Sequence, residues 1–155
     1  MSDTLTEMQR EIEGLKRQLR QFASGQYSGV WTAYTPTPTN FTLGNGTMTA
    51  KYRKGQGYVE FDMTVTLGST SVMGTSPYFS LPVTPTDNGG WTVRLKDPGN
   101  NLYLGTAESS AVTSAVYIYI LTVVGTALSY SGITATSPFT WATGDAIVVH
   151  GIYGI

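Results

Sequence analysis

Two stretches of strict alternation between apolar and polar residues limit the fold of this chain more than any other feature. Between residues 58 and 67, one side of an extended chain carries Val59, Phe61, Met63, Val65 and Leu67. The polar residues between them, such as Glu60 and Asp62, fall on the other side. Residues 47–53 alternate in the same way, and the glycine-rich residues 54–57 join the two stretches. This pattern predicts a β-hairpin with one face in a hydrophobic core and the other in water.

Short strand-like segments continue to the end of the chain. Further strands are expected at residues 78–83, 91–96, 102–107, 115–123, 129–133 and 145–153, with turn-forming residues between them. After residue 25 there is neither a helical period nor a repeat of fixed length. A series of roughly seven to nine short strands predicts a mainly β fold, an antiparallel β-sandwich, over residues 41–155. A jelly roll is the topology that we favour.

The first 25 residues follow a helical period instead. Apolar residues recur at alternating intervals of three and four positions, at Leu5, Met8, Ile12, Leu15, Leu19 and Phe22. We call these six residues the seam; their spacing is that of the a and d positions of a coiled coil and predicts a stalk over residues 1–25. Thr4 and Glu7 have the spacing of a capping box, and Gly25 is expected to lie just past the end of the helix as a C-cap.

The oligomeric role of this helix rests on its seam. A lone helix of this length is not expected to be stable, because its few apolar contacts do not offset the entropy lost on ordering. Either several chains associate through the seam, or the helix folds back on its own β domain; the narrowness of the seam favours association. Glu11 and the following Lys16 would then form an ion pair between neighbouring parallel helices. The heptads do not distinguish two strands from three, because Ile12 is the one β-branched residue of the seam.

Residues 26–40 are expected to form an extended linker or arm. Pro36 and Pro38 exclude a helix and favour extended backbone at the preceding residues. Trp31 is large and apolar, so we expect it to hold the arm against the domain surface or against a neighbouring subunit.

Charge and composition exclude several classes of protein. Eight of the nineteen charged residues lie among the first 22, and the net charge is −1, which argues against a nucleic-acid-binding domain. The absence of cysteine excludes disulfides, a thiolate nucleophile and cysteine-ligated zinc. The N-terminus lacks the apolar segment of a signal peptide, and the most apolar run, residues 115–124, is too short to span a bilayer. We expect neither a signal peptide nor membrane insertion.

The residue types that carry most catalysis form no convincing constellation. His150 is the single histidine and is interpreted as an outward-facing or subunit-facing strand residue. A metal site built from three copies of His150 on a symmetry axis is the alternative. Glu60 and Asp62 have a spacing that suits a glycosidase pair, yet they alternate with core residues and are interpreted as the solvated face of the sheet. We therefore expect no enzymatic activity, no cofactor and no resident metal.

The sequence also contains a small cluster of basic residues. Lys51, Arg53 and Lys54 lie at the end of the predicted hairpin and are interpreted as solvated side chains.

Aromatic residues are the more informative set, with ten Tyr, three Trp and five Phe. Exposed aromatic rings stack on sugars in carbohydrate-binding sandwiches, and Trp91, Tyr103 and Trp141 are our candidates for such stacking. For each of them a place in the core or in an interface is the more frequent role.

A subunit interface has its own candidates. Tyr117 and Tyr119 share one face of a predicted strand whose other face is aliphatic, so both faces are apolar. A strand of this kind is expected to face the core on one side and a second subunit on the other, and Trp31 is added to this set.

Several short segments follow one another in a recognisable order. They are WTAYTPT at residues 31–37, LGNGT at 43–47, the hairpin at 50–67, SLPV at 80–83, PFTWATGD at 138–145 and GIY at 151–153. Together they resemble the C-terminal β-domains of minor tail or fibre proteins from phages of actinobacteria, over about residues 30–155. The resemblance implies a homotrimeric β-sandwich displayed on a virion near the site of host recognition. Such domains usually end a much longer protein, whereas here a short helix precedes the domain.

These observations lead to one expectation and two alternatives. We expect a phage virion structural protein, made in the host cytoplasm: a short trimeric fibre whose stalk binds other virion proteins and whose knob serves attachment, with a host-surface glycan as the candidate ligand. The first alternative is a capsid (head) fibre or decoration protein without a specific receptor. The second, from another class, is a glycan-cleaving enzyme, which the lack of an acid–base pair disfavours.

Overall fold

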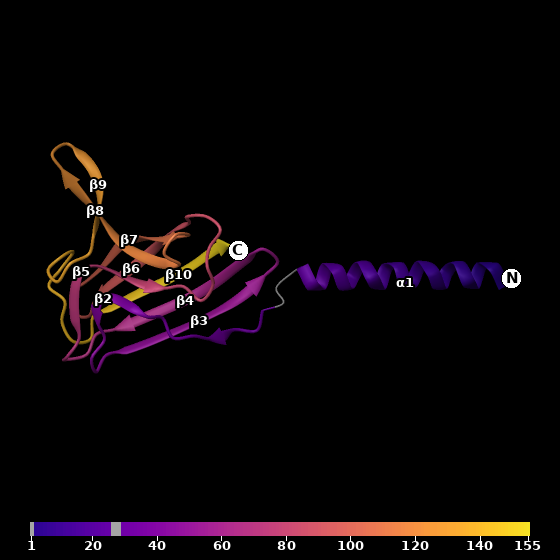
Figure 1. The fold of residues 1–155 in the computed structure, drawn as a ribbon, viewed down its shortest axis with the longest axis horizontal. Coiled ribbons are helices and arrows are strands. Elements are labelled where there is room, and N and C mark those ends of the chain that lie inside the picture. Colours follow the sequence, from indigo (N-terminus) through magenta and orange to yellow (C-terminus); the bar gives the residue numbers. More distant parts are fainter. Residues whose placement is uncertain (1, 26–28) are drawn as a thin grey trace.

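The computed structural model describes residues 2–25 and 29–155, which form one helix followed by ten strands (Figure 1). The helix is α1 (Ser2–Gly25). The strands are β1 (Thr32–Ala33), β2 (Pro38–Thr42), β3 (Thr47–Gly55), β4 (Tyr58–Thr66), β5 (Val72–Ser80), β6 (Gly90–Asp97), β7 (Asn101–Ser110), β8 (Ala115–Val124), β9 (Ala127–Gly132) and β10 (Ala146–Gly154).

All ten strands belong to one antiparallel sheet. Their order is β1-β3-β4-β10-β6-β7-β8-β5-β2, and β9 pairs with β8 beside this path. The sheet curls, so that its two halves face each other (Figure 1). The prediction of a mainly β, antiparallel fold is confirmed, and the curled sheet is consistent with a sandwich-like arrangement.

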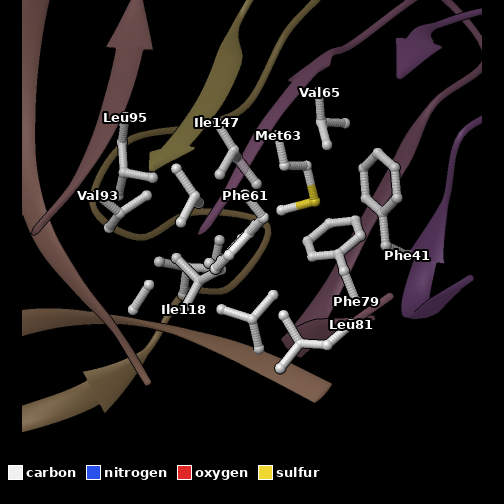
Figure 2. Packing of buried hydrophobic residues seen from close by; sticks show 14 of the residues in the cluster. Phe41, Phe61, Met63, Val65, Phe79, Leu81, Val93, Leu95, Ile118 and Ile147 are labelled. Atoms are coloured by element: carbon white, nitrogen blue, oxygen red, sulfur yellow. The ribbon is translucent and has the colours of Figure 1, made fainter. Parts of the chain in front are cut away.

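The core lies inside the curl of the sheet. Phe61 and Met63 of β4 point into the same space as Phe79 of β5 and Ile118 of β8, which come from the opposite half (Figure 2). The apolar side of β4 is buried along its whole length, as the alternation predicted. Strand β10 lies between β4 and β6 and adds Ile147 to the centre of the cluster. The C-terminal strand therefore closes the middle of the sheet.

The predicted arm contributes two edge strands. Residues 26–28 of this arm lie outside the described part of the chain, whereas Thr32 and Ala33 pair with β3 at one edge of the sheet. Pro38 begins β2, which pairs with β5 at the other edge. A proline is tolerated there because an edge strand has one side without ladder partners. From residue 29 onward the arm is thus an integral part of the β domain.

The helix begins at Ser2, two residues before the predicted cap. Thr4 therefore lies inside the first turn, and the prediction of a capping box at Thr4 and Glu7 is wrong. Ser2 is itself a residue type that commonly begins helices, so the local signal was ambiguous. Gly25, predicted to lie just past the end as a C-cap, is instead the last residue of α1 before the residues that are not described. Among the described residues, no helix is long and apolar enough to cross a bilayer.

Tyr153 of β10 makes the stability of this fold sensitive to alkaline pH. Its side chain is buried and its hydroxyl donates a hydrogen bond to the carbonyl of Val83 at 3.0 Å. Burial raises the pKa of Tyr153 to about 12, and burial of the hydroxyl of the half-buried Tyr34 moves the pKa of that side chain in the same direction. A phenol whose pKa is higher in the folded state holds its proton there at a pH where the unfolded chain has lost it.

We therefore expect the free energy of unfolding to fall as the pH rises from 10 to about 12. Each such tyrosine contributes a slope of at most about 1.4 kcal/mol per pH unit. Denaturant titrations at a series of pH values measure this slope, and Tyr153→Phe should reduce it. An equal slope in the wild type and in Tyr153→Phe would contradict this assignment.

Candidate functional sites on the helix and the β domain

The four described side chains of the seam of α1 are exposed in the single chain. The exposed fractions are 57% for Met8, 46% for Ile12, 64% for Leu15 and 71% for Leu19. The side chains of Leu5 and Phe22, the two ends of the predicted seam, lie outside the described residues. The described part of α1 makes no extensive contact with any strand, and Figure 1 draws it clear of the sheet. The helix is therefore not folded back on its own domain, and its apolar stripe is left without a cover in one chain.

The charged residues beside the seam pair within the helix. The Nζ of Lys16 lies 2.9 Å from Oε1 of Glu13, three residues earlier, and both side chains are exposed. A pair of this kind contributes only about 0.2–0.5 kcal/mol, so Lys16 is free to exchange partners at little cost. The predicted pair of Glu11 with Lys16 joins two chains and stays a prediction.

A row of charged residues crosses the outer face of the sheet. Lys51 of β3, Asp62 of β4 and His150 of β10 lie opposite one another in register. Nδ1 of His150 is 2.7 Å from Oδ1 of Asp62, and Nζ of Lys51 is 3.4 Å from Oδ2 of the same carboxylate. His150 is exposed on the outer face of its strand. Asp62 is thus paired on both sides.

Glu60 departs from its expected environment. It was predicted to lie in water, but its exposed fraction is 7%. Arg53 donates a hydrogen bond from Nε to its carboxylate, and Nε2 of His150 lies 3.7 Å away. The ring of Trp31 lies over the guanidinium of Arg53, 4.8 Å from centroid to Cζ, because the arm pairs with β3. The prediction of a solvated Glu60 is wrong because it took no account of this arm.

This charged row is a set of paired side chains. Lys51 is exposed, as predicted, and also pairs with Asp62, whereas Arg53 is half-buried in its pair with Glu60. Within residues 2–25 and 29–155, no group of three or more His, Cys, Asp or Glu side chains is placed to hold a metal ion. A site formed by three copies of His150 involves three chains and stays a prediction.

The three glycan-stacking candidates lie in two separate places. Trp91 is half-buried at the edge of the core: its ring packs edge-on against Phe61 with centroids 5.4 Å apart, and its Nε1 donates to the carbonyl of Ile152 at 2.9 Å. Tyr103 and Trp141 are brought together through Phe139. The structure thus joins two of the three candidates and separates Trp91 from them.

Tyr103, Phe139 and Trp141 form what we call the aromatic row. The centroids are 5.1 Å apart for Tyr103 and Phe139 and 4.5 Å apart for Phe139 and Trp141. All three rings are partly buried against the core. Phe139 was missed as a site residue, although its place two positions before Trp141 is the spacing that puts two side chains on one side of an extended segment.

The two tyrosine candidates for a subunit interface lie on the outer face of β8, where they stack with Tyr78 of β5, which was not a candidate. Ring centroids are 4.8 Å apart for Tyr78 and Tyr117 and 6.5 Å apart for Tyr117 and Tyr119. Burial first, and then the nearby carboxylate of Glu108, raises the pKa of Tyr119. All three rings are half-buried in a single chain.

Beyond these tyrosines, aliphatic side chains are exposed on β7, β8 and β9. Leu104 of β7 is 65% exposed, Leu121 of β8 is 52% exposed and Leu128 of β9 is 67% exposed. These residues were not predicted as part of a site. For Leu121 and Leu128 the available signal was the absence of any charged residue between Glu108 and Asp145, a stretch that does not include Leu104.

Comparison with known proteins gives one significant similarity. Over 133 residues, the chain is 27% identical to the Mu-like prophage FluMu defective tail fiber protein of Haemophilus influenzae, covering 83% of this chain and 20% of that protein. The chain thus spans about a fifth of the length of this relative. No protein-family model matches the chain, and no solved structure matches it significantly. The similarity supports a distant relationship with phage tail fibre proteins in general.

Proposed function

We propose that this chain is a structural protein of a phage virion, a tail fibre that assembles as a homotrimer. In this proposal α1 forms a three-stranded coiled-coil stalk that binds other virion proteins, and the β domain is the knob. Similarity to a prophage tail fibre protein over most of the chain supports the virion role. The actinobacterial origin, the jelly-roll topology and a role in host attachment belong to the same proposal.

The exposed side chains of the seam are the observation that supports self-association. Four described side chains, Met8, Ile12, Leu15 and Leu19, are between 46% and 71% exposed and lie at consecutive a and d positions. Transfer of a Leu, Ile or Met side chain from water to an interior is worth about 1.5–3 kcal/mol when burial is complete. Association of parallel helices buries this stripe and places Glu11 of one chain beside Lys16 of the next. The number three rests on the resemblance to trimeric phage fibre domains.

Sedimentation equilibrium tests the assembly. The proposal predicts a particle of about 50 kDa, three times the chain mass of 16.7 kDa. A mass of one chain would contradict the proposed assembly, and a mass of two chains would contradict the three-stranded stalk.

The aromatic row favours a second role for the knob, binding of a host-surface glycan. Its rings lie next to one another and are only partly buried, and aromatic faces of this kind stack on apolar faces of sugars. Trp141→Ala should weaken binding of the protein to host cells about tenfold, while circular dichroism and the oligomeric mass stay unchanged.

Trp91→Ala serves as the comparison for this test. Because Trp91 packs on Phe61 in the core, its loss should lower the free energy of unfolding, with no specific effect on cell binding of the folded protein. Unchanged cell binding by folded Trp141→Ala would contradict the glycan role.

A further inference from the structure

The end of β8 and strand β9 form a hairpin that projects beyond the body of the sheet (Figure 1). Ile120 is the last residue of β8 in the hydrophobic core. Beyond it, Leu121 lies opposite Tyr130, and Val123 lies opposite Leu128. Residues opposite one another in an antiparallel pair share a face, as do residues two positions apart. These four side chains therefore occupy one face of the hairpin, which we call the apolar hairpin face.

The apolar hairpin face has no cover within the described chain. Leu121, Val123, Leu128 and Tyr130 are 52%, 70%, 67% and 60% exposed. The surface continues onto β7 through Leu104, which borders the same open hollow as Leu121 and Tyr130. Soluble monomers rarely expose a contiguous apolar patch of this kind, and an isolated two-stranded ribbon is at best marginally stable. Both facts indicate that another surface covers the hairpin.

The surrounding chemistry favours another apolar protein surface as the cover. No charged residue occurs between Glu108 and Asp145, so the hairpin offers no charge that a strongly acidic or basic partner would recognise. The root of the hairpin has an open hollow of about 330 Å³, lined by Thr92, Leu104, Gly105, Thr106, Leu121 and Tyr130. One chain thus carries both an apolar projection and an uncharged hollow. In two neighbouring copies, the apolar projection of one chain can pack against the hollow of the other.

We propose that the apolar hairpin face packs against the β domain of a neighbouring copy of this chain and fastens the knobs together. This inference rests on the proposed trimer, in which joined α1 helices keep the neighbouring domain at high local concentration. It adds a second contact that is separate from the stalk. The stacked Tyr78, Tyr117 and Tyr119 lie on the same side of β8 as Leu121 and Val123, so they extend the proposed contact toward β5.

Val123 and Val124 provide a matched pair of variants for the test. They are adjacent, identical in type and similarly exposed, at 70% and 63%, but they point to opposite faces of the hairpin. Any direct effect of an aspartate on the stability of the hairpin itself should be similar at the two positions. A difference between Val123→Asp and Val124→Asp therefore reports contact on the apolar hairpin face.

The measurement is hydrogen–deuterium exchange of the amides of residues 127–132 in the full chain, together with its mass by sedimentation equilibrium. We expect Val123→Asp to speed the exchange of these amides at least about tenfold relative to the wild type, because the hairpin no longer packs against the neighbouring chain. Val124→Asp should change the exchange rate of the same amides by less than about threefold. Equal effects of the two variants, or no effect of either, in a particle with the mass of three chains would overturn the hairpin contact alone. A mass of one chain for the wild type would overturn the proposed trimer and the contact with it.

Discussion

Replacing both Ile12 and Leu15 with Asp is expected to separate the trimer into single chains. In the proposed stalk, the double variant would place six carboxylates in the seam of three helices. An unpaired charge costs several kcal/mol to bury, and each lost aliphatic contact removes about 1.5–3 kcal/mol more. In the single chain these side chains are already 46% and 64% exposed, so the β domain should fold as before. Sedimentation equilibrium measures the mass, and circular dichroism checks the β structure.

Arg10→Asp with Arg17→Asp is the matched control for this double variant. Both arginines are exposed on α1 and lie outside the seam, so the chain gains the same two aspartates away from the proposed contact. This control should keep the mass of three chains. If Ile12→Asp with Leu15→Asp also kept that mass, assembly would depend on the β domains, and α1 would be only a tether.

Phe61→Ala is expected to lower the free energy of unfolding by about 3–5 kcal/mol. Phe61 is fully buried, and its ring lies 5.4 Å from that of Trp91 and 5.8 Å from that of Tyr153. Its removal leaves a cavity where β4 meets β10 and β6, and a loss of this size is a large part of the stability of an ordinary domain. Chemical denaturation followed by tryptophan fluorescence measures the change, at one protein concentration because assembly contributes to stability.

Thr64→Ala provides the control on the same strand. Thr64 is half-buried on the opposite face of β4, and its loss should change the free energy of unfolding by no more than about 0.5 kcal/mol. Equal effects of Phe61→Ala and Thr64→Ala would contradict a core that is centred on β4.

Local periodicity predicted those parts of the fold that depend on neighbouring residues. The alternation around Phe61 gave the buried face of β4, and the heptad spacing gave α1 to within two residues of its start. Strand order could not be obtained in this way. The pairing of β10 with β4 joins residues almost 90 positions apart, such as Asp62 and His150, and no local period records such a contact.

The candidate sites show the same division. The seam could be predicted from residue spacing, because all six of its residues lie in one helix. The burial of Glu60 did not, because it depends on Arg53 and on an arm that brings Trp31 over the sheet. The two apolar faces of β8 were predicted, but the point after Ile120 where the strand leaves the core was not, because alternation continues past the edge of the sheet.

Electron microscopy of intact particles, with a labelled antibody against the β domain, tests the central claim most directly. If the protein is a tail fibre, the label should lie on the tail of the particle, at the end of the stalk that is not attached to the particle. Label on the capsid would contradict the tail assignment and indicate a head fibre or decoration protein. Purified particles that carry no label would contradict a role in the virion.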